Sequence, residues 1–174
     1  GLDDEARYSH IAWDPGAETV TRVLNELLGA PAVLGRASRL LYDCNRSPTA
    51  PDAIPDRSEK FTIPGNENLS DDQKAIRIER FYQPFNAAVS AMLDEHSSIR
   101  ALVTVHSFTP RYHGKIRAVE LGILHDSDTQ LADAMLDCAP QVTRMQVERN
   151  EPYGPEHGVT HTLKAHGLER GLLN

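Results

Sequence analysis

The chain has 174 residues, of which 40% are hydrophobic and 25% charged, a composition typical of a folded domain rather than a disordered segment. Its formal net charge of −7 argues against a general nucleic-acid binder, because phosphate binding needs a concentrated basic surface. No run approaches the roughly 20 apolar residues that would span a bilayer. The acidic residues 1–5 do not look like a secretory signal. We therefore expect neither a nucleic-acid nor a membrane partner.

The two cysteines, Cys44 and Cys138, are too few for a disulfide framework or a cysteine-rich zinc site. We expect both thiols to be reduced and buried, which favours a cytoplasmic location. The eight histidines are a modest excess, and they raise the question of which could bind a metal.

The first half of the chain predicts two helices separated by a short strand and a long loop. Apolar residues at helical spacing predict a helix over residues 17–28, closed by Gly29. A short apolar run predicts a strand over residues 39–44, and the proline-rich residues 47–68 predict a long ordered loop.

The next helix is predicted to start at Ser70, because Ser70 and Gln73 have the spacing of a capping box. Pro84 lies inside the apolar stripe that follows, so we expect it to kink or interrupt this helix.

Strands and helices alternate in the second half. Residues 101–106 form the most continuous apolar run, which is typical of a strand covered on both faces. The remaining predictions are strands at 119–124 and 142–147 and helices at 129–138 and 160–170. This alternation predicts one α/β domain over residues 1–174, a three-layer sandwich with a mostly parallel mixed sheet.

His106 is the most informative single residue, because it ends the most hydrophobic predicted strand. Ligands collect at the carboxyl ends of strands in open α/β sheets, and neutral imidazole is a common zinc ligand. The alternative is a histidine that caps the strand by bonding to a loop carbonyl. From the residues alone, both interpretations stay open.

A polar cluster, Arg39, Asp43, Asn45 and Arg46, lies at the two ends of the predicted strand at 39–44. Arginine offers a planar fork that suits a carboxylate, asparagine can add a donor, and Asp43 could orient one of the arginines. The cluster therefore predicts a site for a carboxylate-bearing substrate. An ordinary Arg–Asp ion pair that anchors the loop is the other interpretation.

Two further segments carry polar residues with open roles. His10 and Asp14 stand four residues apart before the first long helix, where they could face a metal pocket. Asp14 could instead cap that helix, with Pro15 at the first helical position. Tyr153 could hydrogen-bond a substrate, although its segment is also good turn chemistry.

Several catalytic signatures do not occur in the sequence. These are the Gly-x-Ser-x-Gly nucleophile elbow, a glycine-rich phosphate loop and the zinc-protease motif His-Glu-x-x-His. Neither cysteine has a local catalytic signature.

Five short segments, taken together and in order, resemble the motifs of one known family. They are His-Ile-Ala-Trp-Asp-Pro-Gly-Ala (residues 10–17), Ser-Arg-Leu-Leu-Tyr-Asp-Cys-Asn-Arg-Ser-Pro (38–48), Ile-Pro-Gly-Asn (63–66), Val-His-Ser-Phe-Thr-Pro (105–110) and Asn-Glu-Pro-Tyr (150–153). On these segments the chain resembles the N-formylglutamate amidohydrolase-like family over essentially its whole length.

The resemblance implies a fold similar to the zinc carboxypeptidases and phosphorylase-like α/β proteins. It also implies hydrolysis of a small N-acyl amino acid, such as N-formylglutamate, by a zinc-activated water. The roles that it implies are metal binding for His106 and Asp14 and substrate-carboxylate binding for Arg39, Asn45 and Arg46. From the residues themselves we expect a catalytic role for Tyr153 and supporting roles for His10 and Asp43.

Two departures from the family concern the ends of the sequence. Family members usually begin with a short strand and a histidine-containing turn, and they continue into a strand with Glu-x-Arg, whose glutamate looks like the general base. We expect this chain to lack both strands, so that a zinc ligand and the base lie outside the given sequence. The alternative is a non-catalytic carboxylate-binding domain of the same fold that has lost the metal.

Overall fold

The computed structural model describes residues 2, 4–112 and 114–174. The chain divides into two compact units. Unit 1 comprises Gly1–Ser97 and Val105–Phe108, and unit 2 comprises Ser98–Thr104 and Thr109–Asn174. That the whole chain acts as a single domain stays a prediction.

Unit 1 is built mainly from helices and turns. Its helices are α1 (Asp4–Tyr8), α2 (Ala17–Leu28), α3 (Asp71–Arg77) and α4 (Gln83–Glu95). A two-stranded antiparallel hairpin, β1 (Arg57–Ser58) and β2 (Phe61–Thr62), and a 3-10 turn at Pro64–Asn66 divide the long loop predicted at 47–68.

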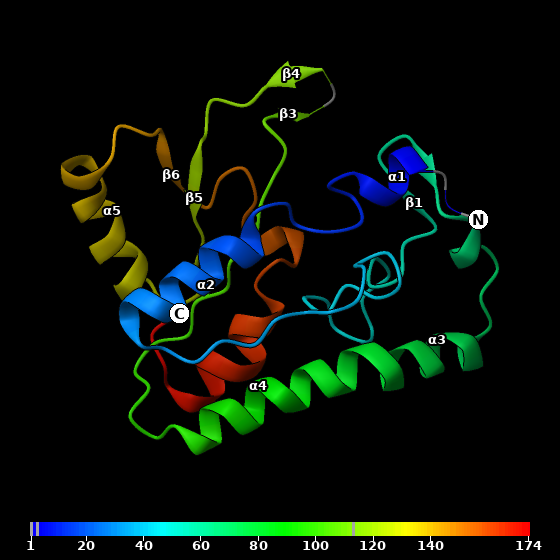
Figure 1. Ribbon diagram of the computed structural model, residues 1–174, viewed down its shortest axis with the longest axis horizontal. Coiled ribbons are helices and arrows are strands. Elements are labelled where there is room, and N and C mark those ends of the chain that lie inside the picture. Colours follow the sequence, from blue (N-terminus) through cyan, green and yellow to red (C-terminus); the bar gives the residue numbers. More distant parts are fainter. Residues whose placement is uncertain (1, 3, 113) are drawn as a thin grey trace. The chain divides into compact units, whose positions relative to one another are not determined.

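Helix α3 begins as the sequence predicts. The Ser70 hydroxyl accepts a hydrogen bond from the Gln73 amide at 3.2 Å, and the Gln73 side chain accepts one from the Ser70 amide at 2.9 Å. The interruption expected at Pro84 takes the form of a π-helical stretch, Ile78–Tyr82, directly before α4. Pro84 itself lies in the first turn of α4, where a missing N–H is tolerated, and Figure 1 shows α3 and α4 as one long rod.

The buried core of unit 1 joins segments that are far apart in sequence. It contains Ala6, Ile11, Ala12, Leu40 and Ile63. Beside it, the buried Asn66 amide donates to the Leu40 and Pro55 carbonyls, and its oxygen accepts a hydrogen bond from Arg77 at 2.7 Å. A buried amide with all these partners satisfied fixes the loops against α3.

The strand predicted at residues 39–44 is wrong, because this segment forms turns. The Leu41 amide bonds the Ser38 carbonyl at 2.9 Å, and the Arg46 amide bonds the Asp43 carbonyl at 2.9 Å. The Asp43 side chain accepts a hydrogen bond from the Asn45 amide at 3.0 Å, the local contact by which aspartate stabilises turns.

Unit 2 contains the parallel strands. β5 (Leu121–Ile123) pairs in parallel with β6 (Val147–Arg149), with Leu121 opposite Val147, and α5 (Gln130–Val142) packs against both (Figure 1). β3 (Arg111–Tyr112) and β4 (Lys115–Ile116) form an antiparallel hairpin. After a 3-10 turn at Pro155–His157, the last helical segment combines a π-helical stretch, Leu163–Gly167, with a 3-10 turn, Leu168–Arg170.

The apolar run at 101–106 does not form the expected strand, covered on both faces, in the described part of the chain. Ala101 pairs with Leu173 in a single parallel bridge, and Val103 is 54% exposed. The mixed α/β class is confirmed. The described residues form three two-stranded sheets, one parallel and two antiparallel, so the three-layer sandwich with a mostly parallel sheet is not confirmed.

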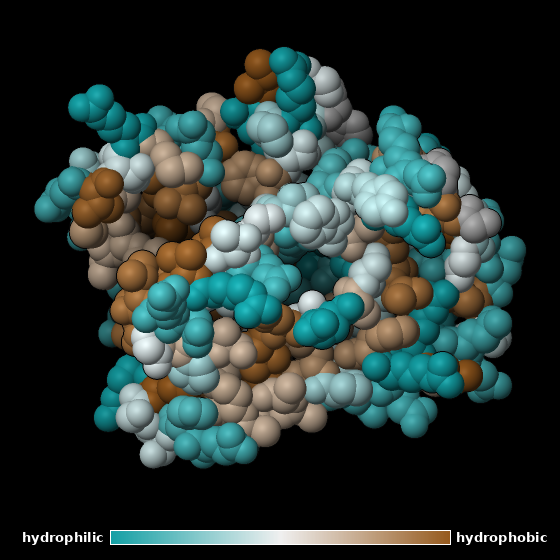
Figure 2. Space-filling view, in the orientation of Figure 1, coloured by the Kyte–Doolittle hydropathy of each residue, from teal (hydrophilic) through white to brown (hydrophobic). Residues whose placement is uncertain are grey.

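Several surface features complete the fold. Among the described residues, no helix combines the length and apolarity needed to cross a bilayer. Hydrophobic side chains gather over α2, where Val20, Val23, Leu27 and Leu28 are 47–75% exposed (Figure 2).

Both cysteines carry free thiols, but Cys138 is exposed, so the expectation that both are buried is wrong for this residue.

Candidate active site

The candidate site of unit 1 is assembled by the turn segment that follows Ser38. The Ser38 hydroxyl and the Arg39 amide both donate to the Ala12 carbonyl, at 2.8 and 3.1 Å. These bonds place the Arg39 side chain beside the segment that carries Asp14.

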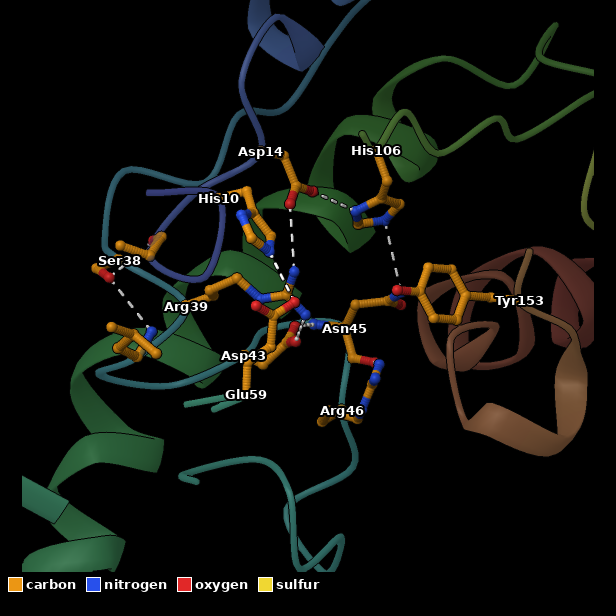
Figure 3. A network of polar contacts seen from close by, with 12 residues as sticks. His10, Asp14, Ser38, Arg39, Asp43, Asn45, Arg46, Glu59, His106 and Tyr153 are labelled. Atoms are coloured by element: carbon orange, nitrogen blue, oxygen red, sulfur yellow. Dashed lines mark hydrogen bonds and ion pairs between the residues drawn. The ribbon is translucent and has the colours of Figure 1, made fainter. Parts of the chain in front are cut away.

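Asp14 does not cap α2. The N-cap is Gly16, whose positive φ of 83° is a conformation that glycine adopts without strain, and Pro15 precedes it. The carboxylate of Asp14 instead bonds two side chains, His106 Nδ1 at 2.7 Å and Arg39 Nη1 at 3.3 Å (Figure 3). The capping interpretation of Asp14 is therefore wrong.

These contacts belong to a closed ring of hydrogen bonds among Asp14, Arg39, Asp43, Asn45 and His106, which we call the His106 ring. Arg39 donates with its other terminal nitrogen to the Asp43 carboxylate at 2.7 Å, and this carboxylate accepts a hydrogen bond from the Asn45 backbone amide at 3.0 Å. The Asn45 side-chain nitrogen lies 3.5 Å from His106 Nε2, which completes the ring. If the Asn45 side-chain amide donates to Nε2, this nitrogen is unprotonated. The proton of a neutral His106 imidazole then lies on Nδ1 and points to Asp14.

The electrostatics of the ring favour a cation. It contains one guanidinium and two carboxylates, so its carboxylates outnumber its guanidinium by one. Burial raises the pKa of Asp14, but the hydrogen bond and charge of His106, together with Arg39, lower it by more, and the net pKa lies below its ordinary value. Asp14 is thus held ionised beside His106, whose side chain is 48% exposed.

Two other predicted site residues of unit 1 bind elsewhere. Arg46 donates through Nε to Asp52 at 2.7 Å and through Nη1 to the Asn45 carbonyl at 3.0 Å. His10 Nε2 lies 3.0 Å from Glu59, so His10 contacts the turn of the β1–β2 hairpin (Figure 3).

Tyr153, the predicted catalytic residue, belongs to unit 2. Its hydroxyl accepts a hydrogen bond from Arg117 at 3.0 Å, and it follows a cis peptide bond between Glu151 and Pro152. The motifs and clusters found in the sequence did not include Arg117. The available signal was a pair of basic residues, Lys115 and Arg117, next to Tyr112 in a short hairpin.

Cys44 lies next to the ring in sequence but is not an activated nucleophile. Burial, followed by the charge of Asp43, raises the pKa of its thiol to about 11. At neutral pH the thiol is therefore protonated and unreactive.

Comparison with known proteins supplies the family. The sequence profile described as N-formylglutamate amidohydrolase matches residues 1–173. The chain belongs to the N-formylglutamate amidohydrolase family. Its fold is also similar to the crystal structure of a gene product from Agrobacterium tumefaciens, with a TM-score of 0.96 and 50% identity over 100% of this chain and 70% of that one. No curated protein gives a significant match.

Membership of the N-formylglutamate amidohydrolase family indicates a hydrolase of this type, and it confirms the resemblance found in the sequence. The zinc that the resemblance implies can be tested against the donor groups. Catalytic zinc takes about three protein ligands. His106 and Asp14 are residue types that bind zinc, but the 2.7 Å contact between His106 Nδ1 and Asp14 Oδ2 is a hydrogen bond, which would have to open before both atoms could hold one metal. No group of three or more suitable side chains occurs in the part of the chain that the structure describes, so the fit is partial.

Proposed function

We propose that this protein is a zinc-dependent amidohydrolase that cleaves the amide bond of a small N-acyl amino acid such as N-formylglutamate. One observation carries the proposal: a histidine and an ionised aspartate face each other within a ring that has two carboxylates and one guanidinium. Such a pair attracts a divalent cation, and the family is one of amidohydrolases. A cytoplasmic location remains part of the prediction.

In this proposal His106 and Asp14 hold the metal, together with at least one ligand not found among the described residues. When bound, zinc would supply an activated water and polarise the amide carbonyl. Arg39 acts as a positioning residue, because its two terminal nitrogens fix Asp14 and Asp43. Asp43 in turn fixes the Asn45 backbone.

We propose that the substrate carboxylate contacts Asn45, Arg39 and Arg46. The hydroxyl group of Tyr153 is proposed to take part in catalysis. Asn45 supports this best, because its amide adjoins His106. Arg39 already pairs with two carboxylates and Arg46 with Asp52, so a substrate carboxylate would share these guanidinium groups with carboxylates of the chain. His10, which contacts Glu59, is proposed to have a supporting role.

The proposal is tested by metal analysis and by formate release from N-formylglutamate, with the wild-type protein and the variant His106→Ala. We expect about one zinc per wild-type chain. His106→Ala should lose the zinc and lower kcat/KM by more than about 100-fold, because even second-shell changes cost 10- to 100-fold at zinc sites. The control is His96→Gln, since His96 is exposed and bonds the Met92 carbonyl of its own helix.

A wild-type protein that hydrolyses the substrate equally well after complete removal of metal would rule out the zinc role. A protein that binds acidic amino acids in the presence of a chelator, but never hydrolyses an amide, would instead be the metal-free binding domain.

A further inference from the structure

Unit 2 contains a cavity of its own, about 370 Å³ in volume. It is lined by Tyr112, Lys115, Ile116, Arg117, Pro152, Tyr153 and His157. The first four belong to the β3–β4 hairpin and the residue after it, and the others to the loop after β6 and its 3-10 turn. We call this cavity the Arg117 pocket.

Arg117 is held between two aromatic rings. Its guanidinium carbon lies 4.8 Å from the centre of the Tyr112 ring and 4.9 Å from that of Tyr153. One terminal nitrogen donates to the Tyr153 hydroxyl at 3.0 Å. Stacking and hydrogen bonding together fix the plane of the guanidinium, so that less side-chain freedom is lost when a ligand binds.

The charge of this pocket is opposite to that of the His106 ring. Arg117 and Lys115 are cationic, and no acidic residue occurs among the described residues that line the cavity. His157 Nδ1 lies 3.1 Å from Glu156 and 3.0 Å from the Gly154 amide. Since an amide can donate only to an unprotonated nitrogen, the Gly154 contact assigns Nδ1 as acceptor and leaves the Nε2 proton as a further donor.

The remaining walls are suited to hydrocarbon. Ile116, Pro152 and the tyrosine rings offer apolar surface, and the volume lies at the small end of ligand cavities, which run from about 300 to 1,000 Å³. The positive charge of a guanidinium attracts a carboxylate, and apolar walls match a short carbon chain.

We propose that the Arg117 pocket binds a small carboxylate with a short hydrocarbon chain, and that Arg117 is its principal contact. This inference rests on unit 2 alone and does not depend on zinc at the His106 ring. The carboxylate could belong to the hydrolase substrate or to another metabolite, and the choice of probe separates these sources.

The test is isothermal titration calorimetry of the full-length protein in EDTA, with glutarate as the probe and its neutral diamide, glutaramide, as the comparison. We expect glutarate to bind and glutaramide not to bind. Arg117→Met should weaken glutarate binding by about 10- to 100-fold, the range for a lost charge-assisted pair of hydrogen bonds. Arg111→Met is the matched control, because it removes one exposed arginine from the same hairpin but does not line the cavity.

Arg117 packs between two rings, so its replacement could prevent folding, which circular dichroism would reveal. In that case Lys115→Met decides, because Lys115 is exposed and its loss should weaken binding by about two- to fivefold. Glutarate binding that is unchanged in Arg117→Met, or in Lys115→Met where Arg117→Met does not fold, overturns the proposal. So does equal binding of glutaramide, or tighter binding of inorganic phosphate.

Titration with N-formylglutamate identifies the source of the carboxylate. Binding tighter than that of glutarate, with the same loss in Arg117→Met, supports the hydrolase substrate as the occupant. Equal binding supports a general carboxylate pocket. Both readouts are independent of metal, so a failure of the zinc proposal would leave this test intact.

Discussion

At the scale of single residues, Asp14 is the residue whose environment the fold changes most. It precedes a helix but does not cap it, and it binds His106 and Arg39 instead. The sequence indicated Asp14, His106 and Arg39 as separate candidates. Their contact depends on segments 92 residues apart in the chain, and local patterns carry no information on that distance.

The lowered pKa of Asp14 predicts an acid-dependent contribution to stability. A carboxyl whose pKa is depressed in the folded state stabilises the fold fully above its unfolded pKa, and the contribution is lost as the pH falls through the folded pKa. In EDTA, Asp14→Asn should lower the free energy of unfolding by about 1–3 kcal/mol at neutral pH. The difference from wild type should stay constant above about pH 5 and shrink below pH 4.

Urea denaturation at a series of pH values measures this difference. Asp137→Asn, which alters an exposed carboxylate of α5, controls for the loss of one charge. A difference that stays constant down to about pH 3 would contradict an ion pair at Asp14.

The two thiols provide a second prediction at this scale. Burial and the charge of Asp43 raise the pKa of Cys44 from 9.0 to about 11, and the thiolate fraction at pH 8 falls accordingly. Iodoacetamide should modify Cys44 about 100-fold more slowly in the folded than in the urea-unfolded protein. The exposed Cys138 serves as the internal comparison, and peptide mass spectrometry follows both. Equal rates at Cys44 in both states would show that the thiol is not protected.

At the scale of elements, helices were predicted better than strands. The limits of α2 agree with its apolar spacing, and the capping box at the start of α3 is present as predicted. These features depend on residues within one or two turns, and such residues are visible in sequence. The apolar runs at 39–44 and 101–106 do not form strands of that length in the described structure, because a strand needs a partner that supplies its backbone hydrogen bonds.

The capping box gives a prediction for α3. Ser70→Ala removes the hydroxyl that accepts the Gln73 amide, and it should lower the free energy of unfolding by about 1 kcal/mol. Ser70→Asp retains an acceptor at the N-cap and should restore most of the loss. Thermal unfolding followed by circular dichroism measures both variants, and an unchanged Tm for Ser70→Ala would show that the cap contributes nothing.

At the scale of the whole molecule, the chain carries a formal charge of −7 but distributes its charges unevenly. The His106 ring in unit 1 combines two carboxylates with one guanidinium, whereas the Arg117 pocket in unit 2 is lined by two basic residues. One region thus favours a cation and the other an anion. The net charge of −7 predicts that nucleic acid is not a partner, but it gave no information on either site.

The sequence by itself determined the family, the mixed α/β class, the positions of the main helices and the set of polar residues worth examining. Motif order and helical spacing are properties of neighbouring residues, and one sequence contains them in full. Tertiary structure alone decided that Asp14 meets His106, that His10 and Arg46 turn to Glu59 and Asp52, and that Arg117 stacks between two tyrosines. In each case several charged or polar groups could bind the same side chain. Which of them lies within hydrogen-bond distance depends on how the folded backbone brings distant segments together.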